Sequence, residues 1–278
     1  IGANVNPNDI IATGNQSIAV VQIADRAIAH IGSNSRVVVQ SLLDTSVTLY
    51  LEKGEVISKV ERLQKGQEYS VKARSVVASV RGTQFLVKAD EKIGKVAVHT
   101  GSVSVKPIIE AEEVEVAEIK ETIVEGGKEA IVTVEEEKVA EEVPVTVQEI
   151  SAKDKIKIET AAKIEVVPQE VLAKPESLEK VQEKIKLNVE KIEKIETLSE
   201  SEIKQQIKKE RIERLMQQKT RTLEEIKEAC ERIDVVKLYS GKTIQGAIID
   251  RTNDYKILTT TGVVEVPKKN VRSVSVLR

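Results

Sequence analysis

The sequence predicts a multidomain protein that is mainly β with one helical segment, and three observations lead to that prediction. Short β-branched runs separated by turn residues fill residues 1–107, as in an all-β solenoid or sandwich. After Pro168 and Pro175 the apolar residues recur with the period of an amphipathic helix. The last 46 residues then return to five short strands, which is the pattern of a small β-barrel.

The composition of the 278 residues excludes several classes of protein. Hydrophobic residues make up 40% of the chain but aromatic ones only 2%, so aliphatic side chains must form the cores. With 43 basic against 45 acidic residues, no overall field attracts nucleic acid or an anionic membrane. Two His and one Cys are too few for a zinc ribbon, a metal cluster or a disulfide framework, so we expect no metal and no cofactor. The sequence contains no run of about 18 apolar residues that would predict a membrane-spanning helix.

Charge counted along the chain divides it further. Residues 1–107 carry 13 basic and 9 acidic groups, whereas residues 109–149 carry 14 Glu against 3 Lys. Together with the changes of period, this predicts four parts. They are an all-β domain at 1–107, an acidic Val/Glu-rich linker at 108–170, a helical or coiled-coil segment at 171–232 and a small β-barrel at 233–278.

The strands expected in the first part are short and bounded by turn residues. One boundary is Lys53-Gly54, which we interpret as a turn between two strands. In the linker, Val or Ile alternates with Glu, but so many like charges on one strand repel one another, so it is predicted to be extended. Short strands or a hairpin are expected there at most, with 155–159 and 163–167 as candidates. The strands predicted in the first part are 17–23, 36–40, 47–51, 55–60, 69–72, 75–80, 84–88, 95–100 and 102–106.

A stripe of apolar residues marks the helical segment. Its members fall at a and d heptad spacing, with Asn188 at an intervening d position. Such a helix can pair within the chain, as a helical hairpin or short bundle, or with a second copy as a coiled coil, and the sequence favours neither. Ser199 to Glu202 and Thr222 to Glu225 have the spacing of capping boxes, which predicts two further helices. The stripe, and hence the candidate helix interface, consists of Leu178, Val181, Ile185, Ile192 and Ile195.

No motif of a common enzyme class is present, so the protein is predicted not to be an enzyme and to have no catalytic residue. Ser240-Gly-Lys-Thr243 copies the end of a phosphate-binding loop, but Val236 stands where that loop needs a second Gly and a strand follows instead of a helix. We interpret it as a hairpin turn. His30 and His99 lie in apolar strand contexts without a nearby Asp, Cys or second His, and such residues are usually structural or exposed.

The last part of the chain is basic, with 8 basic and 4 acidic residues from position 233 onward. A basic small barrel can bind single-stranded nucleic acid by stacking bases on aromatic rings beside a charged groove. Only Tyr239 and Tyr255 could stack here, so a barrel that docks a protein partner is favoured over one that binds nucleic acid.

One segment of the first part carries a more specific pattern. Ser75–Val87 (SVVASVRGTQFLV) is followed by Val96–Val105 (VAVHTGSVSV). Upstream lie Asn8–Gly14 (NDIIATG), Ile31–Val39 (IGSNSRVVV) and Leu49–Val56 (LYLEKGEV). In this order the motifs resemble the FecR domain over residues of about 8–107, with Asn at position 8 where the family has Gly.

The motif Arg81-Gly82-Thr83, with Phe85 after it, is explained by the fold alone. Gly82 permits a backbone conformation that other residues resist, and Thr83 can bond the local backbone. Phe85, the only Phe in the chain, is expected to point into the core. A turn that defines the fold needs these residue types without any ligand, so Arg81 is not interpreted as a binding residue.

The resemblance implies a periplasmic module of the bacterial envelope, because the founding members of the family relay a signal from an outer-membrane transporter to a sigma factor. The anti-sigma role itself is not expected, since the sequence shows no membrane span and no N-terminal helical segment that would hold a sigma factor. The chain begins with Ile1 rather than Met, which suggests that a piece such as a signal peptide was removed. More weakly, Leu238–Ile248 (LYSGKTIQGAI) resembles the start of an Sm-like small barrel.

The expected function follows from this arrangement of modules. We expect a non-enzymatic periplasmic scaffold that binds protein partners, and self-association through the helical segment is a further expectation. Two other functions stay open: a sensor or regulator of transmembrane signalling that acts with a separate membrane protein, and nucleic-acid binding through the C-terminal barrel.

Overall fold

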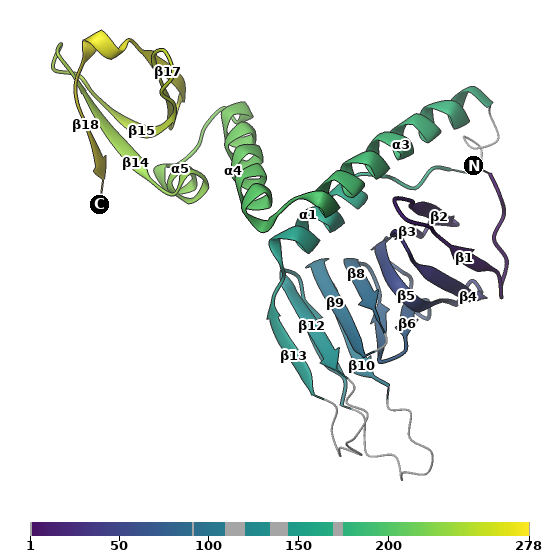
Figure 1. Cartoon of the computed structure of the whole chain (residues 1–278). Helices are drawn as coiled ribbons and strands as arrows, with labels where there is room; N and C mark the ends of the chain where they lie inside the picture. The colour runs from purple at the N-terminus through teal and green to yellow at the C-terminus, as the bar shows by residue number, and fades with distance from the viewer. Residues whose placement is uncertain (1, 91, 109–119, 134–143, 169–174, 278) are drawn as a thin grey trace. The chain divides into compact units, whose positions relative to one another are not determined.

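The structure of the chain is a computed structural model (Figure 1), which describes all residues except 1, 91, 109–119, 134–143, 169–174 and 278. The described residues form two compact units, 1–198 and 199–278. The division therefore falls inside the segment 171–232 that the sequence predicts to be one helical part. The expected linker at 108–170 also contributes elements to the first unit, namely three strands and a helix.

The first unit consists of two β-layers that share one long strand, β5 (Ser46–Val60). The first half of β5 pairs with β4 and β6, and its second half pairs with β3 and β8. The layer called sheet A contains β1 (Ile10–Ala12), β4 (Arg36–Leu42), the first half of β5, β6 (Glu68–Ala73), β7 (Val76–Val80), β10 (Ser102–Pro107) and β11 (Thr122–Glu125). The layer called sheet B contains β2 (Ala19–Ile23), β3 (Ala27–Ile31), the second half of β5, β8 (Gln84–Ala89), β9 (Ile93–Thr100), β12 (Lys128–Thr133) and β13 (Val145–Glu149).

One continuous core fills the space between the two layers. Every second residue of each strand points into it, so the core consists mainly of Val, Ala, Ile and Leu from both sheets. Its two rings, Tyr69 and Phe85, meet edge to face with centroids 6.3 Å apart. The Tyr69 hydroxyl is satisfied there by the Ser58 hydroxyl at 2.9 Å. Among the described strands of this unit only β5 and β6 pair in parallel, and we call the two layers with their shared core the sandwich.

The predicted turn at Lys53-Gly54 is wrong, because β5 runs through it. Gly54 has φ +93°, a conformation that bends the strand so that it leaves sheet A and enters sheet B. A Cβ atom on Gly54 would lie only 2.1 Å from the Ser35 Oγ atom. The same Ser35 hydroxyl accepts a hydrogen bond of 3.0 Å from the Glu55 backbone amide and so fixes the bend.

Two helices follow the strands of the first unit, α1 (Ala152–Ala161) and α3 (Pro175–Thr197). Residues 155–159, for which the sequence suggests a short strand, therefore lie in a helix. The helix begins at Ser151, whose hydroxyl accepts a hydrogen bond from the Asp154 amide at 3.1 Å. A helix of ten residues is marginal by itself, so packing against the sandwich must decide this conformation.

The second unit contains two helices and five strands. Both predicted capping boxes are present: Ser199 begins α4 (Glu200–Gln217) and Thr222 begins α5 (Leu223–Cys230). All five predicted strands form, and β18 returns to pair with β14 in the order β17-β16-β15-β14-β18. The core between α5 and the sheet includes Ile226 and Leu258. The strands are β14 (Ile233–Leu238), β15 (Thr243–Asp250), β16 (Tyr255–Thr259), β17 (Gly262–Val266) and β18 (Val271–Leu277), with a 3₁₀ turn at Lys268–Asn270.

Candidate functional site

The outer face of sheet B carries two rows of side chains that cross the strands. Residues directly opposite each other in a sheet share one face. Glu55, Lys88 and Lys95 stand opposite one another on β5, β8 and β9 and form a charged row. The next row along these strands is apolar and consists of Ile57, Leu86 and Ala97. A surface of this kind can accept an amphipathic helix with charges toward one end.

Helix α1 covers both rows. Its Ile158 and Ala161, one turn apart, join Ile57, Leu86 and Ala97 in one buried cluster. Toward its N-terminus the helix presents two charged side chains, Asp154 and Lys157, both only 2% exposed. Burial of an unpaired charge would cost several kcal/mol, so each of these groups requires a partner on the sheet.

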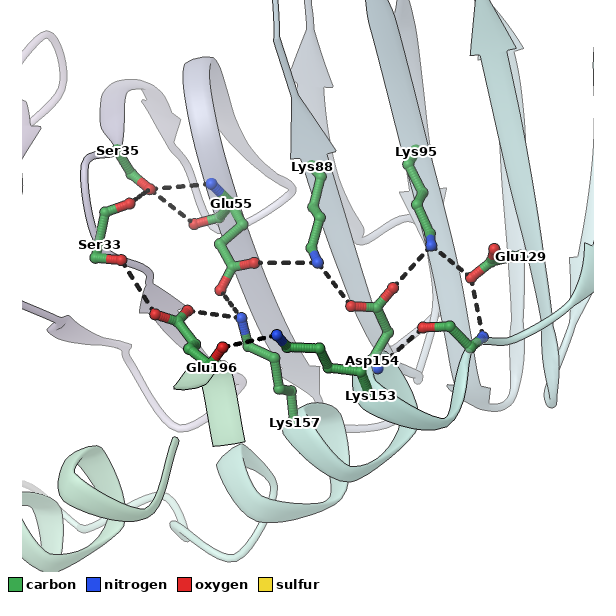
Figure 2. Close-up of polar contacts among 11 residues, drawn as sticks. Ser33, Ser35, Glu55, Lys88, Lys95, Glu129, Lys153, Asp154, Lys157 and Glu196 are labelled. Atoms are coloured by element: carbon green, nitrogen blue, oxygen red, sulfur yellow. Dashed lines mark hydrogen bonds and ion pairs between the residues drawn. The ribbon is translucent and has the colours of Figure 1, made fainter. Parts of the chain in front are cut away.

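Asp154 holds two lysines of sheet B at once (Figure 2). Its Oδ1 atom lies 2.7 Å from the Lys88 ammonium, and its Oδ2 atom lies 2.8 Å from that of Lys95. Lys88 also contacts Glu55 at 3.5 Å, and Lys95 also contacts Glu129 of β12 at 2.8 Å. The carboxylate of Asp154 is therefore the centre of a chain of charges that extends across β5, β8, β9 and β12.

Lys157 extends this chain to the second helix. Its ammonium donates to the Glu55 carboxylate on the sheet and, at 2.8 Å, to Glu196 on α3. Glu196 also accepts a hydrogen bond of 3.3 Å from the Ser33 hydroxyl, and its backbone carbonyl accepts one of 2.7 Å from Lys153. Figure 2 shows these residues converging between the sheet and the two helices. The ion pairs therefore attach both helices to sheet B.

The pairing shifts the ionisation of these groups in a consistent direction. Burial alone would raise the pKa of Asp154, but Lys88 and Lys95 outweigh it and hold the pKa at about 2. Burial would lower the pKa values of both lysines, and the carboxylates around them instead keep those values above the ordinary one. Each group is thus held in its charged form at neutral pH, so the cluster is suited to holding elements together and not to transferring protons.

Two hollows lie beside the network within the first unit. One, of about 400 Å³, is lined by Lys88, Lys95 and Glu55 together with Ala89 and Ile93. The other, of about 450 Å³, lies against α3 and the turns near Asn15 and Ser33. Ser33 and Glu196, which share a hydrogen bond, line both hollows. No group of three or more His, Cys, Asp or Glu that could hold a metal ion occurs among the described residues.

The motif that the sequence singles out lies away from this network, at the turn between β7 and β8. Gly82 has φ +149°, and a Cβ atom there would be 3.2 Å from the Arg62 Cα atom, which explains the glycine. Arg81 is exposed, and Phe85 is fully buried in the core as predicted. The Thr83 backbone, and not its hydroxyl, makes the bonds: its amide and carbonyl pair with Val60 at 3.1 and 2.9 Å. The motif therefore serves the fold.

The comparison with known families decides what the sandwich is. The family model described as "FecR protein" matches residues 9–104, which include the turn at Gly82 and most of both sheets. The chain contains a FecR domain.

Solved structures resemble the chain only distantly. Two crystal structures of a candidate anti-sigma factor from Parabacteroides distasonis match with 19% sequence identity and a TM-score of 0.42. The match covers 55% of this chain and 63% of the other, so it spans less than two thirds of that protein. No curated protein matches the chain. In the described part of the chain, no helix is both long enough and apolar enough to cross a membrane.

Part of the candidate helix interface, which follows the FecR domain in the sequence, is buried by contacts within the chain. Ile192 and Ile195 of α3 are 1% and 4% exposed, and Asn188 donates to the Thr160 carbonyl of α1 at 2.7 Å. This end of the stripe therefore packs within the chain, against α1, which lies outside the segment predicted to be helical. At the other end, Leu178, Val181 and Ile185 are half-buried, so self-association remains a prediction for those three residues.

Of the two residues of the second unit that could stack on bases, one is exposed and the other is half-buried. Tyr239 is 73% exposed in the turn between β14 and β15, which is the hairpin turn predicted for Ser240-Gly241. Tyr255 is half-buried, and the Lys268 ammonium lies 5.9 Å from its ring centroid.

Sequence reasoning missed the network that joins the FecR domain to its helices. Glu55 and Lys88 alternate with core residues, so on sequence alone they belong to a solvated face. Asp154 and Lys157 lie in a segment interpreted as linker. The one available signal was Ser151, which is followed three positions later by Asp154. A hydroxyl and a carboxylate at this spacing indicate the start of a helix.

Proposed function

We propose that this chain is a non-enzymatic regulator that works by binding proteins in the bacterial envelope, with the FecR domain as the module that receives a partner. The observation that carries the proposal is the family match at residues 9–104. The edge strands of the sandwich suit such a role, because an edge strand offers unpaired backbone groups to a partner strand. The periplasm is the proposed location.

The chemistry of the network supports a role without catalysis. Catalytic acids and bases require a pKa near the working pH, whereas Asp154 is held ionised and Lys88 is held protonated. Both are bound to opposite charges from other elements. These groups therefore stabilise an arrangement of elements, as is expected of an interaction module.

Strand β13 is the edge strand at which we expect the partner to bind. Its residues are mostly exposed, and among the described strands it pairs only with β12. Val147 in the middle of β13 is 41% exposed and gives the edge an apolar contact. A regulator that acts with a separate membrane protein would use the same edge, so this alternative concerns the identity of the partner and not the surface.

A photo-crosslinking residue at position 147 tests the proposal in intact cells. The matched control carries the same residue at Leu43, which is 63% exposed in the turn between β4 and β5. We expect one defined protein to be captured from position 147 in the envelope fraction and not from position 43. Equal capture from both positions, or recovery of the chain from the cytoplasm, would contradict it.

Nucleic-acid binding is the second candidate, and it rests on Tyr239 and on Lys268 beside Tyr255. The same crosslinking residue at position 239 examines it. Capture of RNA or DNA there, together with an affinity that falls steeply as salt is raised, would favour this function over protein binding.

A further inference from the structure

Both histidines of the chain lie on the outer face of sheet B, against α1. The sequence contains two His residues in all. His30 of β3 stands opposite Val20 and Ile57, and its ring lies next to the Ala161 backbone at the end of α1. His99 of β9 lies 3.7 Å from the Glu159 carboxylate of the same helix. The only side chains that ordinarily titrate between pH 5 and 8 are thus gathered beneath one helix.

His30 occupies a site that excludes its charged form. The ring is 2% exposed, and neither nitrogen has a hydrogen-bond partner among the described residues. Burial lowers its pKa to about 4, although the Ala161 backbone favours the protonated ring. When α1 moves away, the ring becomes hydrated and its pKa returns to about 6.5.

The charged groups on the elements around His30 already have other partners. On β5, Glu55 and Lys59 lie on either side of Ile57, where Glu55 pairs with Lys157 of α1 and Lys59 with Glu61. On α3, Glu196 also binds Lys157. On β2 the residue opposite His30 is the apolar Val20, and the next side chain on that face is the neutral Gln22. Among these described residues, a proton on His30 would therefore meet no free carboxylate.

His99 acts in the same direction with a smaller effect, because it is only partly buried. Burial lowers its pKa, Glu159 opposes that shift and Lys155 adds to it. Glu159 and Lys155, which shift the pKa of His99 in opposite directions, both belong to α1. Across the sheet, Glu129 is opposite the neighbouring Ala97 and is engaged by Lys95.

We propose that the arm formed by α1 and α3 is released from sheet B in mild acid, and that His30 and His99 drive the release by taking up protons. The core between the two sheets lies on the other face of sheet B, so the arm can leave while the sandwich stays folded. Release uncovers Ile57 and Leu86 together with the charged row. The FecR domain would then present in acid a face that it covers at neutral pH.

The sign and size of the effect follow from His30. A group whose pKa is lower in the docked state than in the released state favours docking above its released pKa, and this contribution is lost as the pH falls from about 6.5 to 4. Between pH 8 and pH 5 the docking equilibrium should shift about 30-fold through His30 alone. The ion pairs of Asp154 do not respond in this window, because the pKa of Asp154 is about 2.

Hydrogen exchange of the whole chain at pH 8 and pH 5, corrected for intrinsic exchange rates, measures the release. We expect the amides of α1 to lose protection about 30-fold, with unchanged protection in β6 and β8. His30→Leu should remove most of this pH dependence, and His99→Gln a smaller part. Equal losses in wild type and His30→Leu would overturn the proposal, as would a parallel loss in β6 and β8, which indicates global unfolding.

A second measurement does not depend on a variant at position 30. The chain has two His residues, so its ring Cε1 proton spectrum contains two titrating signals, and His99→Gln assigns them. We expect the signal of His30 to titrate well below the ordinary value. A midpoint near 6.5 together with an unchanged α1 exchange pattern would contradict an acid-driven release.

Discussion

Gly54 and Gly66 have almost the same backbone conformation in very different surroundings. Their φ angles are +93° and +89°, so an alanine is strained at either position. At Gly66 no atom lies within 4 Å of an added Cβ, whereas at Gly54 the Ser35 Cα atom lies at 2.6 Å. The pair separates the cost of the conformation from the cost of the clash.

We expect Gly66→Ala to lower the free energy of unfolding by about 1 kcal/mol, the cost of a left-handed conformation for a residue with a Cβ. Gly54→Ala should lower it by about 3 kcal/mol or more, because the backbone of Ser35 must also move. Urea unfolding followed by circular dichroism compares the two. Equal losses would mean that the bend of β5 is not held by Ser35.

Asp154 contributes to the docking of α1 by pairing with two lysines of sheet B. Asp154→Asn keeps the shape and removes the charge, so Lys88 and Lys95 each lose a carboxylate but keep Glu55 and Glu129. We expect the docking of α1 to become less favourable by about 2 kcal/mol. This is less than the cost of breaking a buried ion pair whose members have no other partners. The control, Glu159→Gln on the same helix, should cost below about 0.5 kcal/mol because Glu159 is partly exposed.

The pH dependence of the Asp154 effect has a defined sign. Its pKa is about 2 in the folded chain against an ordinary 3.8, so its contribution is present above pH 4 and is lost as the pH falls toward 2. Hydrogen exchange of α1 in wild type and Asp154→Asn should therefore differ at pH 7 and converge near pH 2. A difference that persists there would show that charge is not the cause.

At the scale of elements, α3 uses only part of its apolar stripe. Ile192 is 1% exposed in the cluster with Ile158 and Leu86, while Leu187 on the same helix is 52% exposed. We expect Ile192→Ala to cost about 3 kcal/mol in the docking of α3 and Leu187→Ala below about 0.5 kcal/mol. Exchange protection of α1 and α3 reports the first change, and a larger effect of Leu187→Ala would point to contacts between copies.

The elements that the sequence predicts well are those whose signals are local. The capping boxes at Ser199 and Thr222 place two helix starts correctly, because the hydroxyl and the carboxylate that satisfy the free amides are three residues apart. A strand with one face on the core, such as β10, shows a clear alternation of apolar and polar residues. Each of these signals is contained in a few neighbouring residues.

The elements that it misses depend on distant contacts. Strand β3 is buried on both faces, between the core and α1, and so shows no alternation. In α1 the alternation of Lys and Ile from 155 to 158 imitates a strand, and only the sheet beneath it selects the helix. At Gly54 the glycine marks a bend within a strand, which cannot be distinguished from a turn without knowing the four partner strands.

At the scale of the whole molecule, the cores of 1–198 and of 199–278 are each formed by residues of one unit. Ile226→Ala, at a fully buried position of α5, should lower the stability of the second unit by about 3 kcal/mol. Protection of β5 and β8 should not change. A parallel loss in those strands would show that the two units unfold together.

The candidate site could not be predicted from the sequence, because its partners are far apart along the chain. Lys157 binds Glu55 across 102 positions, and Lys88 binds Asp154 across 66. No spacing rule connects such pairs, and each residue alone is typical of a solvated surface. The family resemblance covers the strands that supply Glu55, Lys88 and Lys95, but it ends before Glu129 and before the helix that supplies Asp154.

Strand β5 connects the two layers of the sandwich mechanically, because it belongs to both. Its backbone hydrogen-bonds to four strands, so sliding one layer past the other would break bonds to β3, β4, β6 and β8 together. Under tension the sandwich should resist shear along β5, and the two layers should separate first at the edge strands β11 and β13, which lie far from β5 in the strand order. A force on these edge strands would therefore move the two layers apart while β5 keeps them joined.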